Sequence, residues 1–198
     1  YDDFKKSIYN TYYKNFNSSF RLTDNQMYVL EKEPKKFLDE YADSICDAIN
    51  DFKNHFDYTK IDFLIDEMMS KECGIFAYNQ PLNCAMEIQN DFFMKNKIIY
   101  VGESYSKQLE IAKSLTKNDL AIIMSNYGNY FSEYKEIKDI LIQNNVPIIL
   151  ITLNYHSPQL LNFKDIIYLS SQPFTSVGSY PMKLFTEYLV RRLRVKYK

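Results

Sequence analysis

From residue 72 onward, short uninterrupted apolar runs alternate with longer amphipathic segments, and this alternation constrains the fold more than any other feature. Uninterrupted apolar runs are typical of strands buried on both faces of a parallel sheet. Strand–helix repetition adds right-handed crossovers, with helices on both faces. The pattern predicts an α/β domain, namely a three-layer, doubly wound, five-stranded parallel sheet. The expected strands are residues 74–77, 98–101, 120–124, 147–152 and 166–169, and the expected helices are residues 82–95, 105–115, 131–144 and 179–195.

The region before residue 72 is more polar and has helical periodicity. Pro34 suits the first turn of a helix. The residues after it place one apolar stripe at helical spacing: Phe37, Tyr41, Ile45, Ile49 and Phe52. A second short helix is expected over residues 59–70. We therefore expect a helical extension over residues 1–71 and the sheet domain over residues 72–198.

The composition excludes several classes of function. A formal net charge of −1 gives the chain no electrostatic means of holding DNA or a membrane surface. His55 and His156 are about a hundred residues apart, which argues against a zinc site, and we expect neither metal nor cofactor. Cys46, Cys73 and Cys84 lack regular spacing, so we expect a reducing, cytoplasmic location. No apolar run approaches the ~18 residues that span a bilayer, so no membrane partner is expected. A basic C-terminal cluster is interpreted as a solvated helix end: Arg191, Arg192, Arg194, Lys196 and Lys198.

In doubly wound sheets, ligands bind beyond the carboxyl ends of the strands, where the strand order reverses. The loop at residues 125–130 is small and polar, and Gly128 permits a tight turn there. Such a loop can offer backbone N–H groups and a helix dipole to an anion. A strand-to-helix connection also needs a turn whatever its function, so the loop alone does not decide between the two interpretations.

Two loops carry a resemblance to a known family. The segment IMSNYGNY (residues 123–130) resembles the Ser-x-Ser-Gly-x-Thr phosphate loop of sugar isomerase (SIS) domains. The segment FAYNQPLNCAMEI (residues 76–88) aligns without a gap with the family's first loop, which carries a GxGxS pattern. Two later segments are similar to family strands: VPIILIT (146–152) and DIIYL (165–169). The resemblance covers about residues 60–195 and implies a sugar phosphate bound between the two loops.

The N-terminal region narrows the resemblance to regulators of the RpiR type. The segment YDDFK (residues 1–5) looks like the end of their helix-turn-helix domain, and residues 34–71 look like their linker helices. The resemblance implies that the DNA reader lies upstream of Tyr1, so DNA would be contacted only through that absent domain. It also implies self-association, as a homodimer or tetramer.

The chain departs from the SIS pattern where the family holds phosphate. Ser125 and Gly128 remain, whereas the other matched positions are Ala77 and Asn79 for two glycines, Pro81 and Tyr127 for two serines, and Tyr130 for the threonine. Pro81 has no N–H to donate, and each tyrosine adds roughly 150–250 Å² of flat amphipathic surface. The pocket should therefore bind a phosphate less well or in a different pose. It could also take a larger or less anionic ligand stacked on tyrosine, or the tyrosines could close an unused cleft.

Isomerases of this superfamily need a positioned general base and electrophilic help at the carbonyl. The candidate bases are Glu87, Glu103, Glu133, Glu187 and His156. Glu87 and Glu187 lie in amphipathic helices and are better explained as surface carboxylates, and a loop histidine is more often a solvated side chain than a base. Glu103 follows the second strand and could face the crevice. With phosphate donors missing and no Ser/His/Asp arrangement, we expect no catalytic residue and no enzyme.

The sequence therefore predicts an effector-sensing SIS domain of a transcriptional regulator of carbohydrate metabolism, which binds a phosphosugar or related carbohydrate derivative. One alternative is a ligand-free dimerisation module, in which the apolar stripe of residues 179–195 forms an interface rather than core. Another is a sugar-phosphate isomerase. The expected ligand-binding residues are Asn79, Gln80, Pro81, Asn83, Ser125, Asn126, Tyr127, Gly128, Asn129 and Tyr130.

Overall fold

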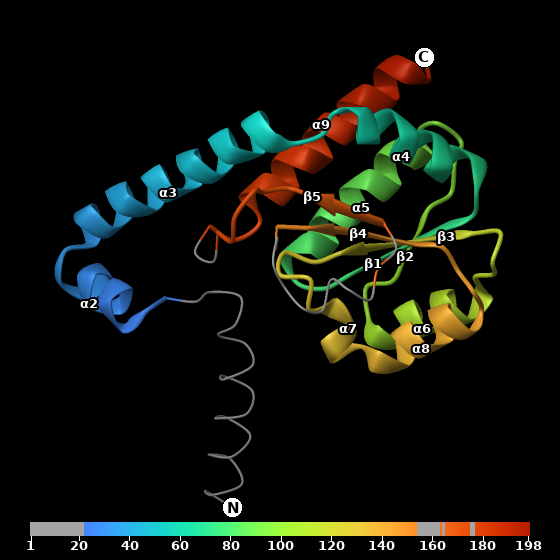
Figure 1. Cartoon of the computed structure of the whole chain (residues 1–198), viewed down its shortest axis with the longest axis horizontal. Coiled ribbons are helices and arrows are strands. Elements are labelled where there is room, and N and C mark those ends of the chain that lie inside the picture. Colours follow the sequence, from blue (N-terminus) through green and yellow to red (C-terminus); the bar gives the residue numbers. More distant parts are fainter. Residues whose placement is uncertain (1–21, 154–162, 164, 175–176) are drawn as a thin grey trace, which may run out of the picture.

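A computed structural model describes residues 22–153, 163, 165–174 and 177–198 (Figure 1). The predicted segment at residues 1–5 and the candidate base His156 lie outside the described residues. At the centre is a five-stranded sheet in the order β2-β1-β3-β4-β5, with every pair parallel. The strands are β1 (Cys73–Ala77), β2 (Tyr100–Val101), β3 (Leu120–Met124), β4 (Ile148–Thr152) and β5 (Asp165–Tyr168). The predicted α/β class with a five-stranded parallel sheet is confirmed.

The central strands β1 and β3 form from uninterrupted apolar runs of the sequence. Every residue of β1 and β3 is buried, because helices cover both faces of the sheet. β2 is shorter than the predicted run of residues 98–101. It forms one edge of the sheet, and Ile98 is 59% exposed beside it.

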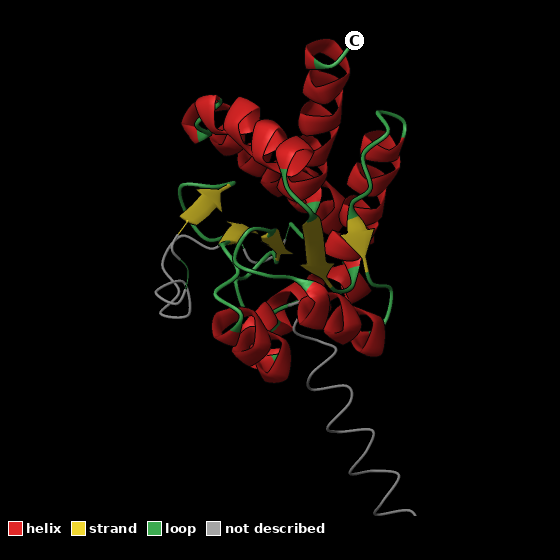
Figure 2. Ribbon diagram, turned by 90° about the vertical axis from the view of Figure 1, so that its right-hand side faces the viewer, coloured by secondary structure: helices red, strands yellow, loops and turns green. Residues whose placement is uncertain are grey.

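Helices form one layer on each side of the sheet (Figure 2). One layer contains α4 (Thr59–Ser70), α5 (Gln80–Phe93) and α9 (Tyr180–Lys196), whose apolar faces share one core cluster with the sheet. The other contains α6 (Tyr105–Ser114), α7 (Tyr130–Glu133) and α8 (Lys135–Gln143). The predicted helix at 131–144 is therefore two helices, because the backbone at Tyr134 (φ −118°, ψ 60°) is not helical.

Within α9, the apolar stripe packs inward. Met182, Phe185, Leu189 and Leu193 are fully buried, whereas Tyr188 is partly exposed. The stripe is thus core, and in this chain it leaves little apolar surface for a partner.

α3 (Pro34–His55) and α4 begin where the sequence predicts, whereas α2 (Asp24–Lys32) was not predicted as a separate helix. α2 starts with a capping box formed by Thr23 and Gln26, and α3 starts at its proline. The first half of α3 projects away from the sheet together with α2 (Figure 1). The second half of α3 and all of α4 pack against the body of the domain, because their apolar residues belong to the core cluster shared with α5, α9 and the sheet. The predicted boundary at residue 71 therefore marks a change of secondary structure within one shared core.

Two sets of polar contacts fix helices to the body of the domain. The buried Asp51 carboxylate of α3 accepts hydrogen bonds from the Ser171 backbone N–H (2.6 Å) and hydroxyl, just after β5. Three basic residues of the C-terminal cluster also form ion pairs that join α9 to α4 and α5: Arg192 with Asp62, Arg194 with Asp91, and Lys196 with Asp66. This end of α9 is thus tied to neighbouring helices and is more than a solvated terminus.

Among the described residues, no helix combines the length and apolar character needed to cross a bilayer. The same residues contain no group of three or more His, Cys, Asp or Glu side chains placed to hold a metal ion.

Candidate functional site

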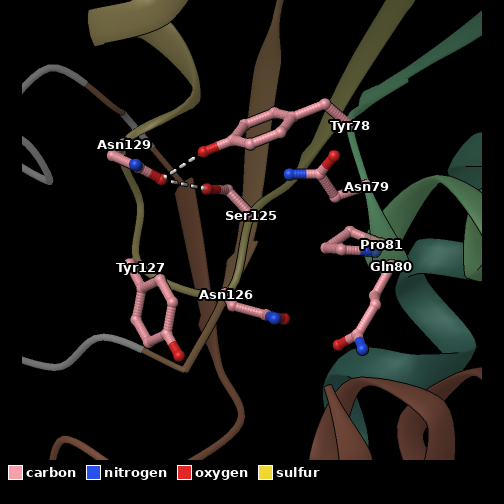
Figure 3. A pocket seen from close by; sticks show the side chains of 8 residues that line it. All are labelled: Tyr78, Asn79, Gln80, Pro81, Ser125, Asn126, Tyr127 and Asn129. Carbon is pink, nitrogen blue, oxygen red and sulfur yellow. Dashed lines mark hydrogen bonds between the residues drawn. The ribbon is translucent and has the colours of Figure 1, made fainter. Parts of the chain in front are cut away.

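A small cleft lies between the loops that follow β1 and β3. The chain leaves β1 for the edge strand β2 and returns on the other side of β1 as β3, so the strand order reverses between β1 and β3. Ligands of doubly wound proteins bind at this position. The cavity measures about 30 Å³, room for about two water molecules. Eight residues line it (Figure 3): Tyr78, Asn79, Gln80, Pro81, Ser125, Asn126, Tyr127 and Asn129.

The first loop is strained at Asn79. Its backbone (φ 55°, ψ −134°) occupies a region that glycine adopts freely and other residues only at a cost of about 1–3 kcal/mol. The family resemblance has glycine at this position, so the chain keeps the glycine geometry with a different residue. Directly afterwards α5 begins, and Pro81 is buried in its first turn, where a missing N–H is tolerated.

The second loop is joined to the first through Asn129. Its side-chain oxygen accepts one hydrogen bond from the Tyr78 hydroxyl (2.9 Å) and one from the Ser125 hydroxyl (3.2 Å), as Figure 3 shows. Gly128 (φ 64°) provides the turn between them, and its N–H donates to the Ser125 carbonyl. Burial raises the pKa of Tyr78 to about 12, so this phenol stays protonated near neutral pH.

Asn126 connects the cleft with the strands beyond it. Its side-chain N–H donates to the Ser179 hydroxyl (2.6 Å), just before α9. Its backbone carbonyl accepts from the Leu153 N–H (3.0 Å) and from the Thr152 hydroxyl (3.3 Å). Its side-chain oxygen is buried and has no hydrogen-bond partner. A buried polar atom left unpaired in this way is uncommon in folded proteins.

Below the cleft lies a buried polar group that no sequence pattern indicated. The Gln108 side chain of α6 donates to the carbonyls of Ala77 (2.7 Å) and Gly102 (2.9 Å), at the ends of β1 and β2. Its oxygen accepts from the Tyr130 hydroxyl. Burial raises the pKa of Tyr130, and its ring packs on Tyr134 at a centroid distance of 4.7 Å. Tyr130 thus supports the loop from beneath.

The structure gathers most of the predicted ligand-binding residues around the cleft, but three lie elsewhere. Asn83 is exposed on α5 and does not line the cavity. Gly128 faces a separate hollow beside α7 and α8, and Tyr130 is fully buried. Tyr78 was missing from the predicted set, although its place as the first residue after β1 is a usable signal.

The candidate bases are not part of the lining. Glu87 and Glu187 both form ion pairs with Lys183 on α9, and the hydrogen bond from Lys183 holds the pKa of Glu187 below its usual range. Glu103 and Glu133 are exposed and do not line the cleft. The described lining therefore presents amides, hydroxyls and aromatic rings.

No protein-family model matches the sequence, and no curated protein matches it. Solved structures match its fold. The NanR protein of Vibrio vulnificus, in complex with ManNAc-6P, has a TM-score of 0.67 and 14% identity over 86% of this chain and 66% of its own.

The sugar isomerase domain of an RpiR transcription factor from Sphaerobacter thermophilus has a TM-score of 0.65 and 13% identity, over 80% of this chain and 89% of its own. A phosphoheptose isomerase from Francisella tularensis has a TM-score of 0.62 and 12% identity, over 81% of this chain and 97% of its own. At such identities the likeness establishes the fold alone: the chain has the α/β fold that sugar isomerase domains share, in regulators and isomerases alike.

Proposed function

We propose that this chain is the effector-sensing domain of a transcriptional regulator and binds a carbohydrate derivative in the cleft between the loops after β1 and β3. The observation that carries the proposal is the position of this cleft at the reversal of strand order. A structural neighbour of the same fold was solved with a phosphosugar, ManNAc-6P, which supports the ligand class.

The regulatory part of the proposal rests on the N-terminal helices and on two neighbours, NanR and the RpiR factor. α2 and the first half of α3 project from the body of the domain (Figure 1). DNA contact through such a domain, self-association as a dimer or tetramer, and a cytoplasmic location belong to the same proposal.

We favour binding over catalysis because the described lining offers no carboxylate, imidazole or ammonium group to move a proton. An isomerase would convert a sugar phosphate to its isomer. Incubation with hexose, pentose and heptose phosphates, followed by ¹H NMR, is expected to show no conversion above a blank. Turnover that disappears in a cleft variant would establish the isomerase alternative.

The proposed function is tested by thermal-shift screening of sugars and sugar phosphates. A ligand at about 100 times its Kd stabilises the folded state by about 2.7 kcal/mol. Asn126→Ala, in the cleft, is expected to abolish the shift, and Asn83→Ala, on the exposed face of the adjoining helix, is expected to keep it. If no compound stabilises the chain, the tyrosines close the cleft and a ligand-free dimerisation module becomes the better description, with an interface other than the buried stripe of α9.

A further inference from the structure

The described residues that line the cleft are all uncharged. Its polar groups are carboxamides, one aliphatic hydroxyl and phenols: Asn79, Gln80, Asn126 and Asn129; Ser125; Tyr78 and Tyr127. No lysine, arginine or histidine is among the described residues that line it. A phosphate ester brings up to two negative charges, and removing them from water beside neutral dipoles is unfavourable without a cation or several free donors.

Two of the positions that resemble the family's phosphate loops offer no free donor here. The Ser125 hydroxyl donates to Asn129, and Pro81 has no N–H. Lys183 lies one turn after Ser179, but its ammonium group is paired with Glu87 and Glu187. Among the described residues, the cleft therefore has no available positive group on the α9 side either.

The unpaired group in the cleft is an acceptor. The Asn126 side-chain oxygen is buried without a partner, and Figure 3 shows this side chain extending between the two loops toward Pro81. A ligand that satisfies this oxygen must donate a hydrogen bond. Sugar hydroxyls and acetamido N–H groups donate, whereas a phosphate dianion offers only acceptors.

From these groups we infer that the ligand of this cleft is an uncharged, unphosphorylated carbohydrate or polyol, whose hydroxyl or amide N–H donates to the Asn126 oxygen. The inference rests on the proposed function and names the ligand class of the same site. The cavity admits only about two waters as it stands, so the exposed side chains of Asn79 and Gln80 must turn outward to admit a sugar ring.

Matched pairs of compounds test this inference by isothermal titration calorimetry: N-acetylmannosamine and its 6-phosphate, glucose and its 6-phosphate, arabinose and its 5-phosphate. In each pair that binds, the neutral sugar is expected to bind at least ten-fold more tightly than its ester. Inorganic phosphate at 10 mM is expected not to compete. Affinity for the neutral sugar is expected to be unchanged between 50 and 500 mM NaCl, because no charge pairs form.

Two variants separate recognition from folding. Asn126→Ala removes the acceptor, and affinity for the neutral sugar is expected to fall at least ten-fold. Asn83→Ala, on the exposed face of α5 outside the cleft, is expected to remain within about three-fold of the parent chain. Circular dichroism melts of both variants establish that they fold.

The outcomes distinguish this inference from the proposed function. If a phosphate ester binds more tightly than its parent sugar, the inference is wrong and carbohydrate sensing stands. If no member of any pair binds the folded protein, both are wrong.

Discussion

Tyr130→Phe is expected to destabilise the fold by about 2 kcal/mol, although Tyr130 is the last residue of the loop that resembles a phosphate site. Tyr130 is fully buried, and its hydroxyl donates to the oxygen of Gln108, which is itself 2% exposed. The phenylalanine ring keeps the packing against Phe76 and Tyr134, so the substitution removes the hydrogen bond alone. A buried acceptor left unpaired costs about 1–3 kcal/mol.

For a chain of this length, a loss of about 2 kcal/mol lowers Tm by roughly 4–8 °C. Urea unfolding followed by far-ultraviolet circular dichroism measures it, with an expected lower midpoint and an unchanged slope. The matched control is Tyr28→Phe, because Tyr28 is 59% exposed and should change stability by less than about 0.5 kcal/mol. A Tyr130→Phe variant as stable as this control would refute the view that Gln108 depends on the Tyr130 hydroxyl.

Three further predictions follow from the same structure. Asn79→Gly should raise the free energy of unfolding by about 1 kcal/mol in urea unfolding. Glycine relieves the strained backbone, and this gain exceeds the entropy that glycine adds to the unfolded chain. A lower free energy of unfolding would mean that the backbone at Asn79 is not strained. Asp51→Asn should lower the free energy of unfolding by about 2 kcal/mol, because it removes the charge-assisted hydrogen bonds from Ser171. The matched variant Asp47→Asn, at an exposed position, should leave the free energy of unfolding almost unchanged. Equal losses in urea unfolding would contradict a stabilising role for the Asp51–Ser171 hydrogen bonds. Burial raises the folded-state pKa of Tyr78 to about 12, above about 10 in the unfolded chain. The stabilisation that comes from the protonated Tyr78 phenol is therefore fully present below about pH 10 and is lost as the pH rises to about 12. Across this pH range the Tm of Tyr78→Phe should fall less steeply than the Tm of the parent chain. An identical fall in both would contradict the burial of this phenol.

Most of the fold could be predicted because it depends on local patterns. The apolar run at residues 120–124 is a central strand, and Pro34 begins a helix, as residue type and spacing indicate. The prediction was less accurate where tertiary position decides. Residues 98–99 are as apolar as the strands, but at the sheet edge only Tyr100 and Val101 pair. No proline or glycine in the sequence indicates the helix break at Tyr134.

The candidate site was predictable to the level of loops, since strand ends in a parallel sheet identify which connections can meet a ligand. The orientation of individual side chains was not. Tyr130 turns inward because Gln108, 22 positions earlier in the chain, receives its hydroxyl, and no spacing rule relates the two residues. Gly128 stands between two lining residues in the sequence but borders a separate hollow, and Asn83, two positions after Pro81, is exposed outside the cleft.

The hydrogen bonds of Ser171 and Ser179 have a mechanical consequence. Ser171 donates hydrogen bonds to Asp51 in the second half of α3, and Ser179 accepts one from Asn126 in the cleft. The two serines stand eight positions apart in the sequence, and their hydrogen bonds reach different places: one reaches α3 and the other reaches the cleft. A ligand that displaced the Asn126 amide from Ser179 would remove the bond at the cleft and leave the bond to α3 in place. Occupancy of the cleft would therefore be coupled to Ser179, eight residues from the hydrogen bond that fixes α3.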